Sequence, residues 1–419
     1  MCVALSPPRA RLCTRAPSLS PAVQLYLRVR AARAYKCGDV ASLDPQHSRA
    51  AKPRDHPYPA AAMLAATLLM HSCLRGAGRV RHIRLAAAAP TDSSSYHVPV
   101  LCAEAVEWLI SDPSGTYVDG TLGGGGHSAA LLAALAPHGG HLIGVDRDPD
   151  ALRTAGERLA PFVASGHASV VRSNFGALPE TLRTVQAGVF ADGYSDGQLH
   201  GILLDLGVSS HQLDEGSRGF SYIRDGPLDM RMDQTDASAG ALTADTILNE
   251  WEGSEIADVL WRYGEERESR RIARAIVNAR PLKTTAELVS ILSTAGSRRE
   301  PKEVNKRLSR VFQALRIEVN REIDELEVIL TAAARLVRPG GRLAVMSYHS
   351  LEDRRVKRLL RSGGFSDVPP PTDAYGNVLA PWKPLTRRAI SASDDEIQAN
   401  SRARSVRLRV GERTEHGPA

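Results

Sequence analysis

Residues 117–146 set two strands around a glycine-rich turn, and this pattern restricts the fold more than any other feature of the sequence. Tyr117-Val118-Asp119 predicts a short strand, residues 120–126 form the turn, and Ala129–Leu135 predicts a helix. A second strand is predicted at His141–Asp146. A strand, helix and strand in this order form a right-handed crossover that leaves both strands parallel in one sheet. The segment therefore predicts an α/β domain.

The alternation of strands and helices continues beyond this unit. A helix is predicted at Asp150–Leu159, and strands are predicted at Ala168–Arg172 and Gly201–Asp205. The last of these strands has the apolar run that is typical of a strand buried on both faces. Together these segments predict a parallel sheet with helices on both faces.

The pattern changes after residue 218, because residues 219–309 contain no convincing strand. Ser254 is suited to cap one helix in this stretch. Thr284 and Glu287 have the spacing of a capping box for another. We therefore expect an inserted all-helical domain at 219–309.

The chain is predicted to return to the sheet through one long helix. Apolar residues recur at steps of three and four from Phe312 to Leu330. A strand is predicted at Gly341–Ser347 and a last one at Ser405–Val410. The expected sheet domain is therefore discontinuous and comprises residues 91–218 and 310–419.

The first ninety residues differ from the rest of the chain. The net charge of +6 comes from this segment, which is rich in arginine and alanine and almost free of acidic residues. Such a composition predicts a transit peptide and a protein of the plastid (chloroplast) stroma or the mitochondrial matrix, with the organelle left open. A tail without defined structure, or a translation start at Met63, is the alternative. The apolar run 59–70 is too short to span a bilayer.

Only one of the five cysteines, Cys102, lies beyond the leader. A single cysteine can form neither an internal disulfide nor a cysteine-rich zinc site. We therefore expect no structural metal in the folded part.

The glycine-rich turn and the acids beside it predict a nucleotide-containing cofactor. Glycines let the backbone approach a ligand closely, and Asp146 follows about twenty residues later, where an acid can accept hydrogen bonds from a ribose. Asp119 directly precedes the glycines and would repel a pyrophosphate, which favours S-adenosylmethionine over a dinucleotide. An NAD(P)-dependent oxidoreductase and a turn without a ligand remain the alternatives from these residues alone.

Several longer strings of residues carry a family resemblance. They are His97–Val100, Asp119–Ser128, Asp146–Pro149, Leu204–Ser210, Gln212–Asp214, Arg218–Ser221, Asp225–Asp233, Tyr263–Glu266 and Ser347–Arg354. These strings resemble the bacterial ribosomal RNA small-subunit methyltransferase H family, also called MraW. The resemblance covers about residues 96–412, and the string Asp225–Asp233 is its most specific part.

The resemblance implies a Rossmann-like class I S-adenosylmethionine methyltransferase with an inserted helical domain, which methylates N4 of a cytidine in small-subunit ribosomal RNA. It implies seven cofactor contacts, namely Gly125, Gly126, His127, Asp146, Phe175, Asp205 and Gln212. Phe175 would pack on the adenine and Asp146 would bind the ribose. The implied partner is small-subunit ribosomal RNA or the assembling small subunit, with no membrane and with a homodimer as an optional state. A non-catalytic ribosome-assembly factor of the same fold is the alternative.

The chain also departs from the family pattern. Tyr222 and Tyr348 stand where Phe is more usual, and Pro often fills the positions of His211 and Ser401. Residues 187–199 form an enlarged loop before the strand at 201–205.

The reaction itself restricts the residues that carry it. The N4 lone pair of cytosine is delocalised into the ring, so an acceptor for the amine protons would favour the transition state. We expect Asp205, or a backbone carbonyl of Leu206 or Gly207, to be that acceptor. Methylation at C5 would instead need a cysteine nucleophile, and Cys102 lies away from the strand ends.

Three groups of basic residues predict contacts with RNA phosphates. The first is balanced by nearby acids and is equally typical of a solvated helix face. The groups are Arg267, Arg270, Arg271, Arg274 and Arg280; then Arg298, Arg299, Lys302, Lys306, Arg307 and Arg310; and finally Arg402, Arg404, Arg407 and Arg409.

Overall fold

The computed structural model describes residues 99–185, 190, 194–235, 241–297 and 300–417. The predicted transit peptide, part of the enlarged loop at 187–199, and Arg298 and Arg299 lie outside the described residues. Within the described ranges, no helix combines the length and the apolar character needed to cross a bilayer.

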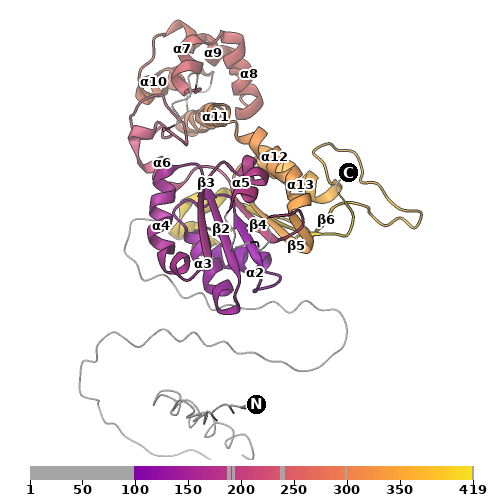
Figure 1. The fold of residues 1–419 in the computed structure, drawn as a ribbon. Helices are drawn as coiled ribbons and strands as arrows, with labels where there is room; N and C mark the ends of the chain where they lie inside the picture. Colours follow the sequence, from indigo (N-terminus) through magenta and orange to yellow (C-terminus); the bar gives the residue numbers. More distant parts are fainter. Residues whose placement is uncertain (1–98, 186–189, 191–193, 236–240, 298–299, 418–419) are drawn as a thin grey trace, which may run out of the picture. The chain divides into compact units, whose positions relative to one another are not determined.

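Seven strands form one sheet in the order β3-β2-β1-β4-β5-β7-β6 (Figure 1). Strands β1 to β5 are parallel, and β7 runs antiparallel to both β5 and β6. The strands are β1 Thr116–Asp119, β2 His141–Asp146, β3 Ala168–Arg172, β4 Leu199–Asp205, β5 Val337–Ser347, β6 Trp382–Pro384 and β7 Arg407–Arg413.

The predicted strands at 117–119, 141–146, 168–172 and 201–205 are confirmed within two residues at each end. Strand β5 begins earlier than predicted, since it includes Pro339 and Gly340. These two residues are exposed at the start of the strand. The register between β4 and β5 shifts between the pairs Leu199–Val337 and Gly201–Arg342, and Gly340 has φ 78, so the strand bulges where the sequence indicates a turn.

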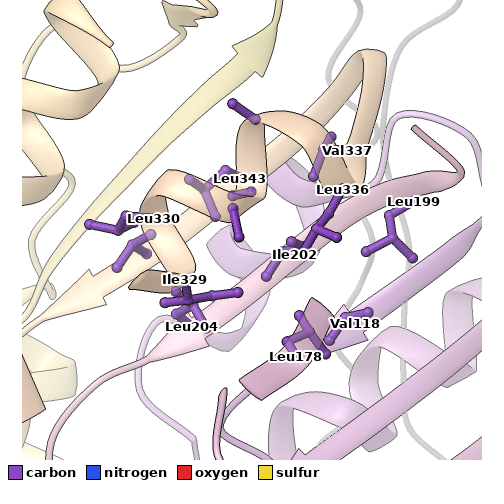
Figure 2. Packing of buried hydrophobic residues seen from close by; sticks show 14 of the residues in the cluster. Val118, Leu178, Leu199, Ile202, Leu204, Ile329, Leu330, Leu336, Val337 and Leu343 are labelled. Carbon is purple, nitrogen blue, oxygen red and sulfur yellow. The ribbon is translucent and has the colours of Figure 1, made fainter. Parts of the chain in front are cut away.

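Helices cover both faces of the sheet, as expected for parallel strands. One face packs against α2 Cys102–Leu109, α3 Gly126–Leu135 and α4 Pro149–Ala164, and the other against α5 Leu178–Thr184, α12 Glu322–Leu336 and α13 Ser350–Ser362. Successive residues of β4 alternate between the two cores. Leu203 faces the first set of helices, whereas Ile202 and Leu204 face the second (Figure 2).

Five helices between β4 and β5 build a hydrophobic cluster of their own. They are α7 Ala244–Glu250, α8 Gly253–Gly264, α9 Ser269–Asn278, α10 Thr285–Ala295 and α11 Pro301–Asn320. The chain leaves β4 at the carboxyl edge of the sheet, and it returns through α12, which packs on the sheet and leads back to the start of β5, so both connections to these helices lie near the carboxyl edge. Shorter elements complete the chain: η1 Ala136–His138, η2 Phe175–Ala177, α6 Ser210–Asp214, η3 Gly216–Arg218, α14 Asp394–Ala399 and η4 Ser401–Ser405.

One of the two predicted helix caps is correct. Thr284 caps α10, and its hydroxyl and the Glu287 carboxylate bond reciprocally to backbone N–H groups. The predicted cap at Ser254 is wrong, because Glu252 occupies the capping position and forms its box with Glu255. A carboxylate at this position accepts the same N–H bonds as a hydroxyl.

The prediction of one long helix from 312 to 330 is also wrong, because the chain breaks at Arg321. This residue has φ 51 and ends α11, and α12 begins at Glu322. Val311, Phe312 and Leu315 of α11 belong to the helical cluster, whereas Leu326 and Leu330 of α12 belong to the sheet core. The apolar periodicity continues across the break, so the sequence hides it.

The backbone at Arg321 gives a direct test of this break. A left-handed conformation costs a residue other than glycine about 1 kcal/mol, and the ion pair of Arg321 with Asp324 is exposed and worth little. We expect Arg321→Gly to raise the free energy of unfolding by up to about 1 kcal/mol and Arg321→Val to lower it. Urea denaturation followed by circular dichroism measures both. A continuous helix would give the opposite order.

Candidate active site

A cavity of about 410 Å³ opens at the carboxyl ends of β1, β2 and β4. In parallel α/β sheets this edge is where ligands bind. The wall combines the glycine turn, the ends of three strands, α6 and the start of α12. Its predicted residues are Gly126, His127, Asp146, Phe175, Asp205 and Gln212.

The glycine turn packs tightly under the cavity. Gly123 and Gly125 have φ 50 and φ 74, which favour glycine at both positions. A Cβ atom on Gly125 would lie 3.2 Å from the Cβ of Ala155 in α4. Gly125 does not line the cavity, so its geometry serves the packing of the turn against α4.

Asp119 lies below the turn and not in the cavity wall. Its carboxylate accepts hydrogen bonds from the Ser128 hydroxyl at 2.7 Å and from the Thr121 N–H at 3.2 Å. The side chain is buried, and burial raises its pKa. These contacts brace the glycine turn from beneath.

Asp146 ends β2 and fastens the turn to the next strand. Its two carboxylate oxygens accept the N–H groups of Gly123 at 2.8 Å and Asp148 at 2.9 Å. Burial raises its pKa to about 6, and the charges of Asp148 and Asp119 add to this rise. The carboxylate lines the cavity and keeps lone pairs for a further donor, as recognition of a ribose requires.

Gln212 is held in place by a buried acid. Asp148 caps α4, and one of its oxygens accepts from the Gln212 amide at 2.8 Å and from Arg218 at 2.9 Å. All three side chains are buried. Gln212 also closes the capping box of α6 with Ser209, so its orientation is fixed from both ends.

Asp205, at the end of β4, forms the most elaborate contacts of the site. Its backbone N–H donates to the Thr121 hydroxyl at 2.6 Å, which joins β4 to the glycine turn. Its carboxylate accepts from the Tyr348 hydroxyl at 2.8 Å, and its other oxygen lies 3.6 Å from Nδ1 of His127. Burial raises the pKa of Asp205, and His127 and Tyr348 oppose this rise.

The His127 side chain contacts both Val100 and Asp205. Nε2 of His127 lies 2.9 Å from the Val100 carbonyl oxygen, which can only accept, so Nε2 carries a hydrogen. Nδ1 lies 3.6 Å from the Asp205 carboxylate, which is too long for a hydrogen bond, so this second contact is electrostatic. The His127 side chain therefore lies between Val100 and Asp205.

The wall beyond Asp205 consists of buried ion pairs that the sequence did not indicate. Arg316 of α11 binds both oxygens of Glu322 at 2.7 and 2.9 Å. Glu352 of α13 accepts the Tyr348 N–H at 2.8 Å and lies 3.1 Å from His349. Burial opposes the ionisation of Glu352, but these contacts keep its pKa below the usual value.

The string Asp225–Asp233 reaches the cavity through one residue, Met232. The Met232 N–H donates to the Asn320 side chain at 2.8 Å, and Arg147 donates to the Asn320 carbonyl at 3.0 Å. Asp229 pairs with Arg231 within an ion-paired turn. The string therefore ties the start of the helical segment to the end of α11, and Met232 covers part of the cavity.

The predicted basic groups divide into structural and accessible residues. Arg280 and the buried Arg307 donate to backbone carbonyls inside the helical cluster, so they do not face a ligand. Arg409 is bound by both oxygens of Asp353. The remaining described members are exposed or half-buried, namely Arg267, Arg270, Arg271, Arg274, Lys302, Lys306, Arg310, Arg402, Arg404 and Arg407.

Cys102 lies at the start of α2 and does not line the cavity. Burial, with the charges of Glu104 and Glu396, raises the pKa of its thiol to about 11. A thiol in this state is not a nucleophile at neutral pH. The position of Cys102 and its protonated thiol argue against a mechanism in which a cysteine attacks cytosine.

The sheet order with an antiparallel β7 and the cavity at the glycine turn define a Rossmann-like class I methyltransferase that uses S-adenosylmethionine. The chain belongs to the MraW methylase family, whose sequence pattern matches residues 94–414. It thus falls in the family that the sequence strings indicated.

Curated relatives agree with this assignment. The chain is 46% identical over 334 residues to the ribosomal RNA small subunit methyltransferase H of Chloroherpeton thalassium, covering 77% of this chain and 99% of the relative. It is 47% identical over 320 residues to the protein of the same name from Symbiobacterium thermophilum, covering 75% and 96%. Among solved structures, NSun6 from Pyrococcus horikoshii has a TM-score of 0.31 and 13% identity, over 75% of this chain and 51% of that one.

The residues of the cavity fit S-adenosylmethionine. Asp146 offers free acceptor positions for the ribose, Phe175 offers an aromatic surface for the adenine, and Asp205 with Gln212 offers polar groups for the methionine end. The volume of about 410 Å³ lies within the range of small-molecule sites. We propose these residues, with Gly126 and His127 in the wall and Gly125 in the packing of the turn, as the cofactor site.

We expect the raised pKa of Asp146 to make cofactor affinity depend on pH. A carboxylate accepts hydrogen bonds from hydroxyl groups better than the neutral carboxylic acid does. Affinity for S-adenosylmethionine should therefore fall as pH drops through about 6. Asp146→Asn should weaken binding by about 10- to 100-fold at pH 7.5 and remove this dependence. Isothermal titration calorimetry between pH 5 and 8 measures both effects. Equal affinities of the variant and the parent protein would reject this role for Asp146.

Proposed function

We propose that the protein transfers a methyl group from S-adenosylmethionine to the exocyclic N4 amine of a cytidine in small-subunit ribosomal RNA. The name shared by the curated relatives supports the RNA substrate. The observation that carries the choice of an amine is Asp205, a half-buried carboxylate in the cavity wall whose oxygens are oriented by Tyr348 and His127.

The amine nitrogen gains positive charge as it attacks, and it must lose a proton when the new bond to carbon has formed. Asp205 can accept a hydrogen bond from the amine before the reaction and take the proton afterwards. The backbone carbonyls of Leu206 and Gly207, which also line the cavity, are the alternative acceptors. S-adenosylmethionine would supply the electrophilic methyl group, activated by its sulfonium.

Tyr348 and His127 act through Asp205. Their contacts hold the carboxylate in one orientation and oppose the rise of its pKa, which keeps more of it in the ionised form that accepts protons. Thr121 fixes the backbone of Asp205 to the glycine turn, so cofactor site and acceptor site share one rigid support. Such positioning supplies much of the rate enhancement when two substrates must meet in line.

The target base must leave a helix or lie in a single strand to enter this cavity. The helical segment, residues 219–309 in our domain assignment, is proposed to bind the RNA around the base, with its exposed Arg267, Arg270 and Arg274 as contacts. Import into a plastid or mitochondrion and a homodimer stay predictions from the sequence.

The proposal is tested by the product. Wild-type protein with S-adenosylmethionine and unmodified small-subunit RNA should yield N4-methylcytidine, measured by mass spectrometry of nucleosides. Asp205→Asn should lower kcat by about 10²- to 10³-fold, because its amide cannot take the proton. Asp367→Asn, a surface substitution, is the matched control and should leave kcat unchanged. Appearance of 5-methylcytidine or a ribose methyl group instead would contradict the proposal.

Tyr348 provides a second test through the pH profile. Removing its hydroxyl removes a hydrogen bond to the Asp205 carboxylate, so the pKa of Asp205 rises further. The acidic limb of the kcat/KM profile should move to higher pH by about one unit in Tyr348→Phe. Tyr222→Phe is the matched control, since the Tyr222 hydroxyl contacts Ser309 in the helical segment. An unshifted profile for Tyr348→Phe would show that Asp205 is not the titrating acceptor.

A further inference from the structure

A second cavity of about 430 Å³ adjoins the first and has a basic wall. Both cavities include Tyr348 and Ser405 in their lining, so they meet at these two residues. We call the second cavity the basic groove. Its charged and polar lining residues are His349, Ser350, Asp353, Arg354, Lys357, Ser391, Arg404, Ser405 and Arg407.

The sheet topology builds this groove. Strand β7 is antiparallel to β5, and Ser347 at the end of β5 pairs with Arg407 at the start of β7. Helix η4 and the first residues of β7 therefore reach the same carboxyl edge as the cofactor cavity. The opposite wall is one face of α13, where Ser350, Arg354 and Lys357 follow one another at helical steps of four and three residues.

The cations of the groove are only partly neutralised. Arg354 pairs with Glu265 at 3.1 Å, and Arg407 lies 3.5 Å from Asp353. Both oxygens of Asp353 already accept hydrogen bonds from Arg409. Lys357 and Arg404 are exposed and form no ion pair within the described residues. The groove thus carries accessible positive charge beside an opening to the cofactor cavity.

We propose that the basic groove binds the phosphate backbone of the RNA strand that flanks the target nucleotide. The inference rests on the proposed function, because a base that enters the cofactor cavity leaves its neighbouring phosphates at the cavity opening. Lys357, Arg404 and Arg407 would contact these phosphates, and Ser350 and Ser391 offer hydroxyl donors. An acidic protein segment has no comparable reason to lie beside Tyr348 and Ser405.

The test removes two cations without touching the cofactor cavity. Lys357→Ala/Arg404→Ala should raise the KM for unmodified small-subunit RNA about tenfold, with kcat and the affinity for S-adenosylmethionine within twofold of the parent protein. The slope of log affinity against log salt for a single-stranded RNA oligonucleotide should fall by about 1.4, since each phosphate contact accounts for about 0.7.

The control variant removes the same charge at the opposite edge of the sheet. Lys383 of β6 lies opposite Glu412 of β7, and Glu412 lies opposite Arg342, near the start of the parallel part of β5. Arg183 lies near the end of α5. Lys383→Ala/Arg183→Ala should leave the KM and the salt slope unchanged. Equal losses in both double variants would overturn the proposal, because only net charge would then matter.

Two further outcomes are decisive. If Lys357→Ala/Arg404→Ala weakens binding to assembled subunits but not to naked RNA, the groove binds a protein and the proposal is wrong. If the wild-type protein methylates no RNA, the proposed function fails, and the oligonucleotide salt slopes still decide whether the groove binds phosphates.

Discussion

The structure depends on the burial of carboxylates at one edge of a parallel sheet. An unpaired buried charge is strongly unfavourable, so each acid there needs its own donors. Asp119 receives them from Thr121 and Ser128, Asp146 from two backbone N–H groups, and Asp148 from Gln212 and Arg218. These donors belong to the glycine turn, α3, the loop before α4, α6 and η3. Satisfying the acids therefore also fixes the elements that surround the cavity.

The same requirement joins the helical segment to the sheet. Arg218 donates to the backbone carbonyl of Met232 at 2.7 Å as well as to Asp148. The Asn320 side chain donates to the Met230 carbonyl and accepts from the Met232 N–H. The backbone carbonyl of Asn320 accepts from Arg147. The two chain connections to the helices are thus held by polar contacts that reach the cavity wall. A shift of the helices would therefore disturb Met232 and, with it, the cavity wall.

The sequence predicts much of this arrangement and misses particular parts for physical reasons. The strand ends, the glycine turn and Asp146 follow from local patterns, because strands and tight turns are determined by neighbouring residues, whereas Asp205 follows from the family resemblance. The break at Arg321 could not be predicted, since no glycine marks it and the apolar periodicity continues. The contact of Tyr348 with Asp205 joins residues 143 positions apart, and only the pairing of β4 with β5 brings them together. In the sequence, the only signal for this contact is that Tyr348 stands where Phe is more usual.

Strand β7 comes last in sequence among the strands but lies between β5 and β6 in the sheet. Until residues 407–413 have left the exit tunnel of the translating ribosome, β5 has no partner on one side and β6 has no partner at all. The nascent chain must therefore hold the rest of the sheet open at that edge. The sheet can be completed only after β7 has emerged, because β7 joins β6 to β5.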